Sequence, residues 1–296
     1  MSTVPDEPDV DACVGELDRQ DPATVASGVR AVVFDLDGTL YEGEAFLPVY
    51  LDELGVHTGI DLSAARTQVE AILVGQHQVG LGDLYDPRTD RILRAPAWRL
   101  VEAVTWDGQP VDDPRIGRAV TPAERLTYLG DAWQVVRVVA EHLGAPLDGV
   151  RAAFRAVREA INADPDRLLD TSALPQVLAE LHRFEHRSVL TNTTEELGRD
   201  LVAALGLDAW FETIRYGARK PAGTEAWLQE VIAELDAEPD QVLCIGDNHY
   251  NDVLPAVRSG CRAVWVDPYG LDPHRGPEVR VDRVAEVAAL LRGAAA

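Results

Sequence analysis

Short runs of apolar residues alternate along the chain with longer segments whose apolar positions recur every three or four residues. The short runs predict buried parallel strands, and the longer segments predict helices that pack on a sheet. Leu174, Val177 and Leu181, for example, fall on one face of a single expected helix. This alternation indicates βαβ units and therefore an α/β fold. The expected strands are Arg30–Phe34, His186–Leu190, Glu212–Tyr216, Gln241–Ile245 and Arg262–Val266, and the expected helices cover 172–183, 194–205, 222–235, 252–259 and 281–291.

Residues 41–168 interrupt this alternation and are expected to form a separate unit. Their apolar spacing is helical, and a loop rich in Gly, Pro and Asp at 105–121 divides the unit into two halves. We therefore expect an all-helical insertion directly after the first strand. Its helices are expected at Val49–Leu54, Leu62–Val79, Ile92–Val104, Pro122–Leu143 and Leu147–Ile161.

The pattern divides the chain into three parts. Residues 1–28 are rich in Asp, Glu and Pro and are expected to form a loose acidic extension. Residues 29–40 and 169–296 carry the strand–helix alternation and form the α/β core, into which 41–168 are inserted.

The charge of the chain narrows its possible partners. It carries 50 Asp and Glu against 27 Lys and Arg, a net charge of −23, which argues against nucleic acids and anionic membranes because no basic patch can contact phosphates. No apolar run approaches the ~20 residues that span a bilayer, and the amino terminus lacks a secretion signal. We expect a cytoplasmic protein, a monomer or homodimer, that binds a small molecule.

Asp35 and Asp37 directly follow the first expected strand, and Gly38 ends it. Ligands of open α/β sheets bind at the carboxyl ends of the strands. Side chains two positions apart on an extended chain point the same way, so we expect both carboxylates in one small volume. Two like charges held that close raise the pKa of one of the carboxyl groups or attract a cation. The alternative interpretation is a turn closed by Asx hydrogen bonds.

Three further motifs follow in order. They are Thr191 with Asn192 after the second main strand, Lys220 before Pro221, and GDNHYND at 246–252. With DLDGT at 35–39, these motifs resemble the four motifs of the haloacid dehalogenase-like superfamily, in that family's order. The resemblance covers 29–40 and 170–270, and it implies a Rossmann-like parallel-sheet core with an inserted α-helical cap domain.

The resemblance also implies catalytic roles for individual residues. Asp35 would be the nucleophile that forms an aspartyl-phosphate, and Asp37 the general acid and base. Thr191 would donate a hydrogen bond to the phosphoryl group, together with backbone N–H groups near Asn192. Lys220 would pair with the nucleophile and a phosphoryl oxygen, and it is the only lysine beside 26 arginines. A compact ammonium is not replaced well by a planar guanidinium.

A magnesium site follows from the same resemblance. Asp247 would bind Mg²⁺ together with a carboxylate oxygen of Asp35 and the backbone carbonyl of Asp37. Oxygen ligands suit this cation. Asp252 would hold a metal-bound water or orient Lys220.

The function expected is that of a Mg²⁺-dependent phosphohydrolase acting on a small phosphorylated metabolite. The presence of Asp37 argues against dehalogenation, because dehalogenases of this superfamily lack an aspartate there. Two alternatives stay open: a phosphomutase of the β-phosphoglucomutase type, and a catalytically silent binding protein. His249 is interpreted as a surface residue at the rim of the site. Trp98, Trp106 and Trp133 are interpreted as packing residues of the cap, and the alternative is that they line a substrate pocket.

Overall fold

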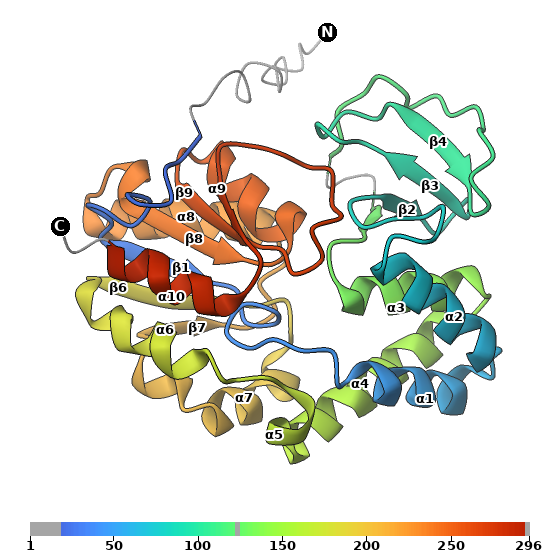
Figure 1. Ribbon diagram of the computed structural model, residues 1–296, viewed down its shortest axis with the longest axis horizontal. Helices are drawn as coiled ribbons and strands as arrows, with labels where there is room; N and C mark the ends of the chain where they lie inside the picture. The colour runs from blue at the N-terminus through green and yellow to red at the C-terminus, as the bar shows by residue number, and fades with distance from the viewer. Residues whose placement is uncertain (1–18, 122–124, 294–296) are drawn as a thin grey trace, which may run out of the picture.

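The structure is a computed structural model that describes residues 19–121 and 125–293 (Figure 1). Two units lie side by side: the core, built from β1 and from the chain after residue 168, and the inserted cap. Among the described residues, no helix combines the length and the apolar character needed to cross a lipid bilayer.

The core is a six-stranded sheet whose neighbouring strands all run parallel. β1 (Ala31–Phe34) lies between β6 (His186–Leu190) and β8 (Val242–Gly246), so other strand ends flank its carboxyl end. This sheet confirms the predicted α/β fold class with a Rossmann-like core. The strand order is β10-β9-β8-β1-β6-β7, where the outer strands are β7 (Thr213–Arg215), β9 (Arg262–Val266) and β10 (Val279–Val281).

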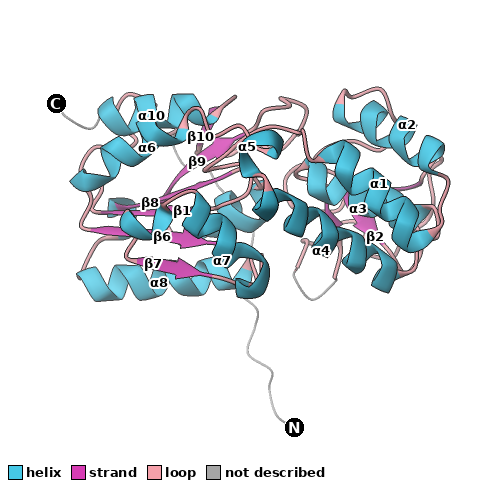
Figure 2. Ribbon diagram, turned by 90° about the horizontal axis from the view of Figure 1, so that it is seen from below, coloured by secondary structure: helices cyan, strands magenta, loops and turns pink. Residues whose placement is uncertain are grey.

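Helices cover both faces of the sheet (Figure 2). Val32 and Phe34 of β1 pack with the apolar cluster that includes α6, α7 and α10, whereas Ala31 and Val33 pack with the cluster of α8 and α9. The central strand is therefore buried on both faces, which explains its unbroken apolar run. The helices are α6 (Leu174–Glu180), α7 (Glu195–Ala204), α8 (Ala222–Leu235), α9 (Leu254–Arg258) and α10 (Val284–Gly293).

The last part of the expected acidic extension packs against the core. Val25 and Ala26 are buried, and the Arg262 guanidinium donates to the carbonyl oxygens of Val25 at 3.0 Å and Ser27 at 2.7 Å. The expectation of a loose segment therefore fails for residues 19–28, while 1–18 lie outside the described residues.

The cap contains the helices α1 (Leu47–Thr58), α2 (Leu62–Leu73), α3 (Ala132–His142) and α4 (Leu147–Ala163). Aspartates fix two of their starts: the Asp61 carboxylate accepts from the backbone N–H of Ser63 and Ala64, and Asp131 accepts from Gln134. The predicted helix 62–79 stops early, at residue 73. The one predicted over 122–143 begins only at residue 132, and its residues 122–124 lie outside the described residues.

The middle of the cap is a β-sheet, so the prediction of an all-helical insertion is wrong there. The helix expected at Ile92–Val104 is instead a hairpin of β3 (Arg91–Arg94) and β4 (Glu102–Thr105). Pro96, which cannot donate a hydrogen bond within a helix, lies between the two strands. Ile92 and Leu93 belong to two different apolar clusters, so both faces of β3 are buried. The sequence therefore lacks the alternation of apolar and polar residues that marks a strand with one exposed face. The sheet has the order β4-β3-β2-β5, with β2 (Leu84–Asp86) and β5 (Thr127–Tyr128).

The chain enters and leaves the cap at one point. Glu42 and Asp170 exchange two backbone hydrogen bonds, each 2.8 Å long, so the two connecting segments are joined side by side. Gly43 follows with φ +97°, a conformation that favours glycine. We call the paired residues Glu42 and Asp170 the hinge between the cap and the core.

A second connection joins the cap sheet to the core loop between β9 and β10. Trp98 stacks on His274 with ring centroids 4.1 Å apart, and the Tyr128 hydroxyl donates to the Asp272 carboxylate. The His274 ring nitrogens contact Asp272 Oδ1 at 2.7 Å and the carbonyl oxygen of Ala95 at 2.9 Å. We call Trp98, Tyr128, Asp272 and His274 the clamp.

His249 lies beside the clamp and corrects the prediction of a surface residue. It is 4% exposed, and its ring centroid lies 5.5 Å from that of Trp98 and 4.7 Å from that of Trp265. Burial lowers the pKa of His249 even though Glu278 partly opposes this effect. The imidazole therefore acts as a packing element where the cap sheet meets the core.

Replacing Trp98 with alanine is expected to lower the free energy of unfolding by about 3–5 kcal/mol, the usual effect of removing a large buried aromatic side chain. Trp98 is 7% exposed, whereas Trp210, at 37%, serves as the matched control, for which a change of about 0.5 kcal/mol or less is expected. Urea unfolding measures both variants, and a loss of about 0.5 kcal/mol or less for Trp98→Ala would show that Trp98 does not stabilise the folded state.

Candidate active site

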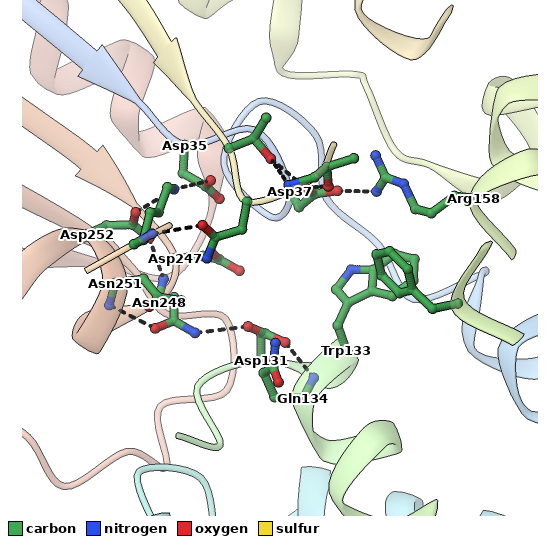
Figure 3. A pocket seen from close by; sticks show the side chains of 15 residues that line it. Asp35, Asp37, Asp131, Trp133, Gln134, Arg158, Asp247, Asn248, Asn251 and Asp252 are labelled. Atoms are coloured by element: carbon green, nitrogen blue, oxygen red, sulfur yellow. Dashed lines mark hydrogen bonds and ion pairs between the residues drawn. The ribbon is translucent and has the colours of Figure 1, made fainter. Parts of the chain in front are cut away.

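A polar cavity lies where the carboxyl ends of β1, β6 and β8 face the cap helices (Figure 3). Its volume is about 140 Å³, which suits a small ligand. The structure places all of the predicted site residues on its wall: Asp35, Asp37, Thr191, Asn192, Lys220, Asp247 and Asp252. The cap adds Asp131, Trp133, Gln134, Phe154 and Arg158.

Lys220 lies between two carboxylates. Its Nζ donates to Asp35 Oδ1 at 2.5 Å and to Asp252 Oδ1 at 2.6 Å, and its side chain is 3% exposed. Burial alone would lower the pKa of Lys220, but Asp252 and Asp35 raise it above its ordinary value, so the ammonium stays charged. Asp252 thus makes the direct contact with Lys220 that one of its two expected roles requires.

Asn192 and Thr191 shape the loop beside Lys220. The Asn192 side-chain oxygen accepts from the backbone N–H of Lys220 at 2.8 Å. Thr191 Oγ1 accepts from the backbone N–H of Thr193 at 3.0 Å and donates to Asp37 Oδ2 at 3.4 Å. The residues of the second and third motifs are therefore joined directly.

Asp37 does not share the surroundings of Asp35. It accepts from the Arg158 guanidinium and the Tyr41 hydroxyl, and from Thr193 Oγ1 at 3.3 Å. Burial alone would raise the pKa of Asp37, but the charge of Arg158 and the hydrogen bonds from Tyr41, Arg158 and Thr193 hold it below its ordinary value.

Both carboxylates reach one small cavity, as predicted, but they point toward different partners within it. Asp35 accepts a hydrogen bond from Lys220, whereas Asp37 points toward Arg158 (Figure 3). The strand ends at Phe34, and Gly38 has φ +77°. Side chains two positions apart share a direction only on extended chain, and here the chain has already turned.

Three carboxylates converge where the metal was expected. One oxygen each of Asp35, Asp247 and Asp252 lies within 4.8 Å of the others. Gly38 allows this approach, since a Cβ there would lie 2.2 Å from Asp247 Oδ2. The side chain of Asp37, a residue predicted to bind metal through its backbone carbonyl, is not part of the cluster.

The electrostatics of this cluster fit a hard divalent cation. Burial raises the pKa of Asp247 well above its ordinary value, and repulsion from Asp35, Asp131 and Asp252 raises it further. The pKa of Asp35 is also raised by burial, to about 7, because Lys220 offsets only part of the desolvation. Three carboxylates share the single positive charge of Lys220, and such oxygen donors are the ligand set that hard divalent cations prefer.

The sequence analysis missed the contribution of the cap to this site. Asp131 Oδ2 accepts from Asn248 Nδ2 at 3.0 Å, which joins the start of α3 to the fourth motif. Arg158 falls on the apolar stripe of α4, next to Val157 and Ile161. An arginine on an apolar stripe predicts a buried charge with a partner, because charges are rarely buried alone. The sequence therefore held a signal for Arg158. Trp133 also lines the cavity, which was the alternative to its expected packing role.

A parallel sheet that carries an acidic pocket beneath an inserted cap defines a capped α/β enzyme. The model of one family, described as hydrolase, haloacid dehalogenase-like hydrolase, matches residues 29–260. The chain belongs to this haloacid dehalogenase-like hydrolase family, and the resemblance read from its motifs is confirmed. A comparison with curated protein sequences gives no match.

Solved structures of the same superfamily resemble the chain over most of its length. The putative HAD-hydrolase YfnB from Bacillus subtilis is 15% identical, with 89% of this chain and 99% of that chain covered and a TM-score of 0.52. This likeness shows the fold. The L-2-haloacid dehalogenase from Xanthobacter autotrophicus is 19% identical, with 90% and 100% covered and a TM-score of 0.45. A HAD phosphatase from Thermococcus onnurineus is 16% identical, with 90% and 99% covered and a TM-score of 0.49.

Proposed function

We propose that the protein is a Mg²⁺-dependent phosphohydrolase that acts on a small phosphorylated metabolite through an aspartyl-phosphate. The observation that carries this proposal is the buried contact of Lys220 with both Asp35 and Asp252, beside Asp247 in the same cavity. A carboxylate can attack phosphorus only where the charge on the phosphoryl oxygens is neutralised, and these residues supply the nucleophile and one of the cations.

In the first step an oxygen of Asp35 forms a bond to phosphorus while the bond to the leaving oxygen breaks. Lys220 neutralises charge between the nucleophile and a phosphoryl oxygen. The Thr191 hydroxyl and the backbone N–H groups near Asn192 orient the other phosphoryl oxygens. Each of these groups lies on the wall of the cavity.

Asp37 acts as the general acid and then as the general base. In its contacts with Arg158 and Tyr41 this carboxyl is ionised, so it must leave them and take up a proton when the ester binds. It then gives that proton to the leaving alcohol, and afterwards takes one from the water that attacks phosphorus and releases Asp35 and phosphate. An alkyl halide needs no such acid, so the presence of Asp37 favours phosphate ester hydrolysis over dehalogenation. A phosphomutase would use the same groups. An assay of released phosphate, with and without a sugar bisphosphate, separates the two activities.

Asp35 and Asp247 would hold the metal with carboxylate oxygens, and Asp37 with its backbone carbonyl. Asp252 lies close enough to contribute as well. When bound, Mg²⁺ neutralises charge on the phosphoryl group.

Removal of the metal is expected to abolish activity. EDTA should stop the release of phosphate, and added Mg²⁺ should restore it. Asp247→Ala should weaken the binding of Mg²⁺ strongly, because it removes a carboxylate of the cluster. The variant should therefore need more Mg²⁺ for activity. The control is Asp240→Ala, at the opposite end of the same strand and 67% exposed in its side chain. Full activity in chelator, or equal effects of both variants, would place the metal elsewhere.

A further inference from the structure

The Arg158 guanidinium is a buried cation with unused hydrogen-bond donors. It extends from α4 of the cap and is 1% exposed. Its Nη1 donates to Asp37 Oδ1 and, at 3.2 Å, to the Tyr41 hydroxyl oxygen. Its Nε and Nη2 are buried and have no hydrogen-bond partner among the described residues. A buried guanidinium normally has its donors satisfied.

The position of this side chain connects the unused donors to the cavity. Arg158 lines the cavity together with Trp133 and Phe154, and its guanidinium lies 5.6 Å from the centroid of the Trp133 ring. The aromatic neighbours hold the guanidinium in place without satisfying its donors. Anionic oxygens are the partners that fit such a planar group, because they can accept two parallel N–H donors.

The charges around the cavity leave Arg158 as the cation for an anionic group on the alcohol side. Five carboxylates line it: those of Asp35, Asp37, Asp131, Asp247 and Asp252. Among the described residues on its wall, Lys220 and Arg158 are the cations, and Lys220 is already shared by two carboxylates. A leaving group with its own negative charge would be repelled here unless Arg158 paired with it.

We propose that Arg158 binds a second anionic group of the substrate, on the alcohol side of the phosphate ester. This inference rests on the proposed phosphohydrolase function and names its substrate class: phosphate monoesters whose alcohol carries a carboxylate or a second phosphate near the ester oxygen. The second anion takes the Arg158 donors that Asp37 now occupies and fills those left unused. Asp37 is then free to face the leaving oxygen.

Three substrates with the same two-carbon skeleton test this proposal. Phosphoglycolate carries a carboxylate, ethylene glycol bisphosphate carries a second phosphate, and hydroxyethyl phosphate carries a neutral hydroxyl. At least one anionic substrate is expected to exceed the neutral one by ~10-fold or more in kcat/KM, since a site built around a hydrogen-bonding group rejects analogues that lack it. The better anionic substrate shows whether Arg158 prefers a carboxylate or a phosphate.

Arg158→Gln is expected to reduce this ratio to about one, chiefly by lowering kcat/KM for the anionic substrate. The control is Arg155→Gln on the same helix, where the arginine pairs with Glu196 at 2.6 Å and its side chain is 49% exposed. This variant should keep the ratio of the parent. If Arg158 only fastened the cap to the core, Arg158→Gln would lower all three rates by the same factor.

Two results would overturn the proposal: a ratio near one in the parent enzyme, or a ratio that survives in Arg158→Gln. The ratio in the parent enzyme is measured without any variant, so this test does not depend on the folding of Arg158→Gln. If Arg158→Gln misfolds, Arg158→Lys is used in its place. An aryl phosphate identifies failure of the underlying function. Hydrolysis of that ester without a preference for anionic substrates rejects the role of Arg158 alone, whereas no hydrolysis of any ester rejects the phosphohydrolase as well.

Discussion

Asp35→Asn is expected to lower kcat for phosphate ester hydrolysis by at least ~10⁴-fold, a loss typical of removing a catalytic nucleophile. The amide keeps the size of the carboxylate and can still accept a hydrogen bond from Lys220, which lies 2.5 Å from Asp35 Oδ1. Lys220 also keeps Asp252 as a charged partner. The folded state should therefore survive, and the melting temperature should change little.

Released phosphate from an aryl phosphate measures this effect, and Asp208→Asn, a change of an exposed aspartate, is the matched control. Activity of Asp35→Asn close to that of the parent would reject the aspartyl-phosphate mechanism. A loss of activity that comes with unfolding would instead give Asp35 a structural role.

Lys220→Arg is expected to lower kcat by at least ~10²-fold, comparable to the loss of one donor that stabilises the transition state. The variant keeps the charge but not the shape. The Lys220 ammonium fits between Asp35 and Asp252 at 2.5 and 2.6 Å in a nearly inaccessible position, and a planar guanidinium is too large for that space.

The neighbouring Arg219→Lys variant provides the reverse exchange at an exposed position of the same loop and should retain activity. Lys220→Met, which removes the charge, should be no milder than Lys220→Arg. If Lys220→Arg were as active as the parent, the compact ammonium would not be needed, and the role given to the third motif would be wrong.

The sequence predicted the core well because its signals are local. The predicted strands His186–Leu190 and Arg262–Val266 have the bounds of β6 and β9. In β9 the continuous apolar run Ala263–Val266 is typical of a strand buried on both faces. The motif residues Asp35, Lys220 and Asp247 all reach one cavity, because parallel strands bring their carboxyl ends to one edge of the sheet.

The errors arose where tertiary packing overrides local pattern. The Ile92–Val104 segment has helical spacing, but both faces of its hairpin are buried and no alternation survives. His249 is polar in sequence but lies in an aromatic cluster assembled from distant segments. The pairing of Arg158 with Asp37 joins residues 121 positions apart, a distance at which spacing carries no information.

The clamp and the hinge together restrict how the cap can move. A cap joined to the core only at Glu42 and Asp170 could swing in any direction allowed by those two segments. The clamp adds a second fixed point through Trp98 and His274, and a body held at two separated points retains only rotation about the line that joins them. A pivot of α3 and α4 about this axis, with the cap sheet held against the core, would open the site only by breaking the contacts of Asp131 with Asn248 and of Arg158 with Asp37.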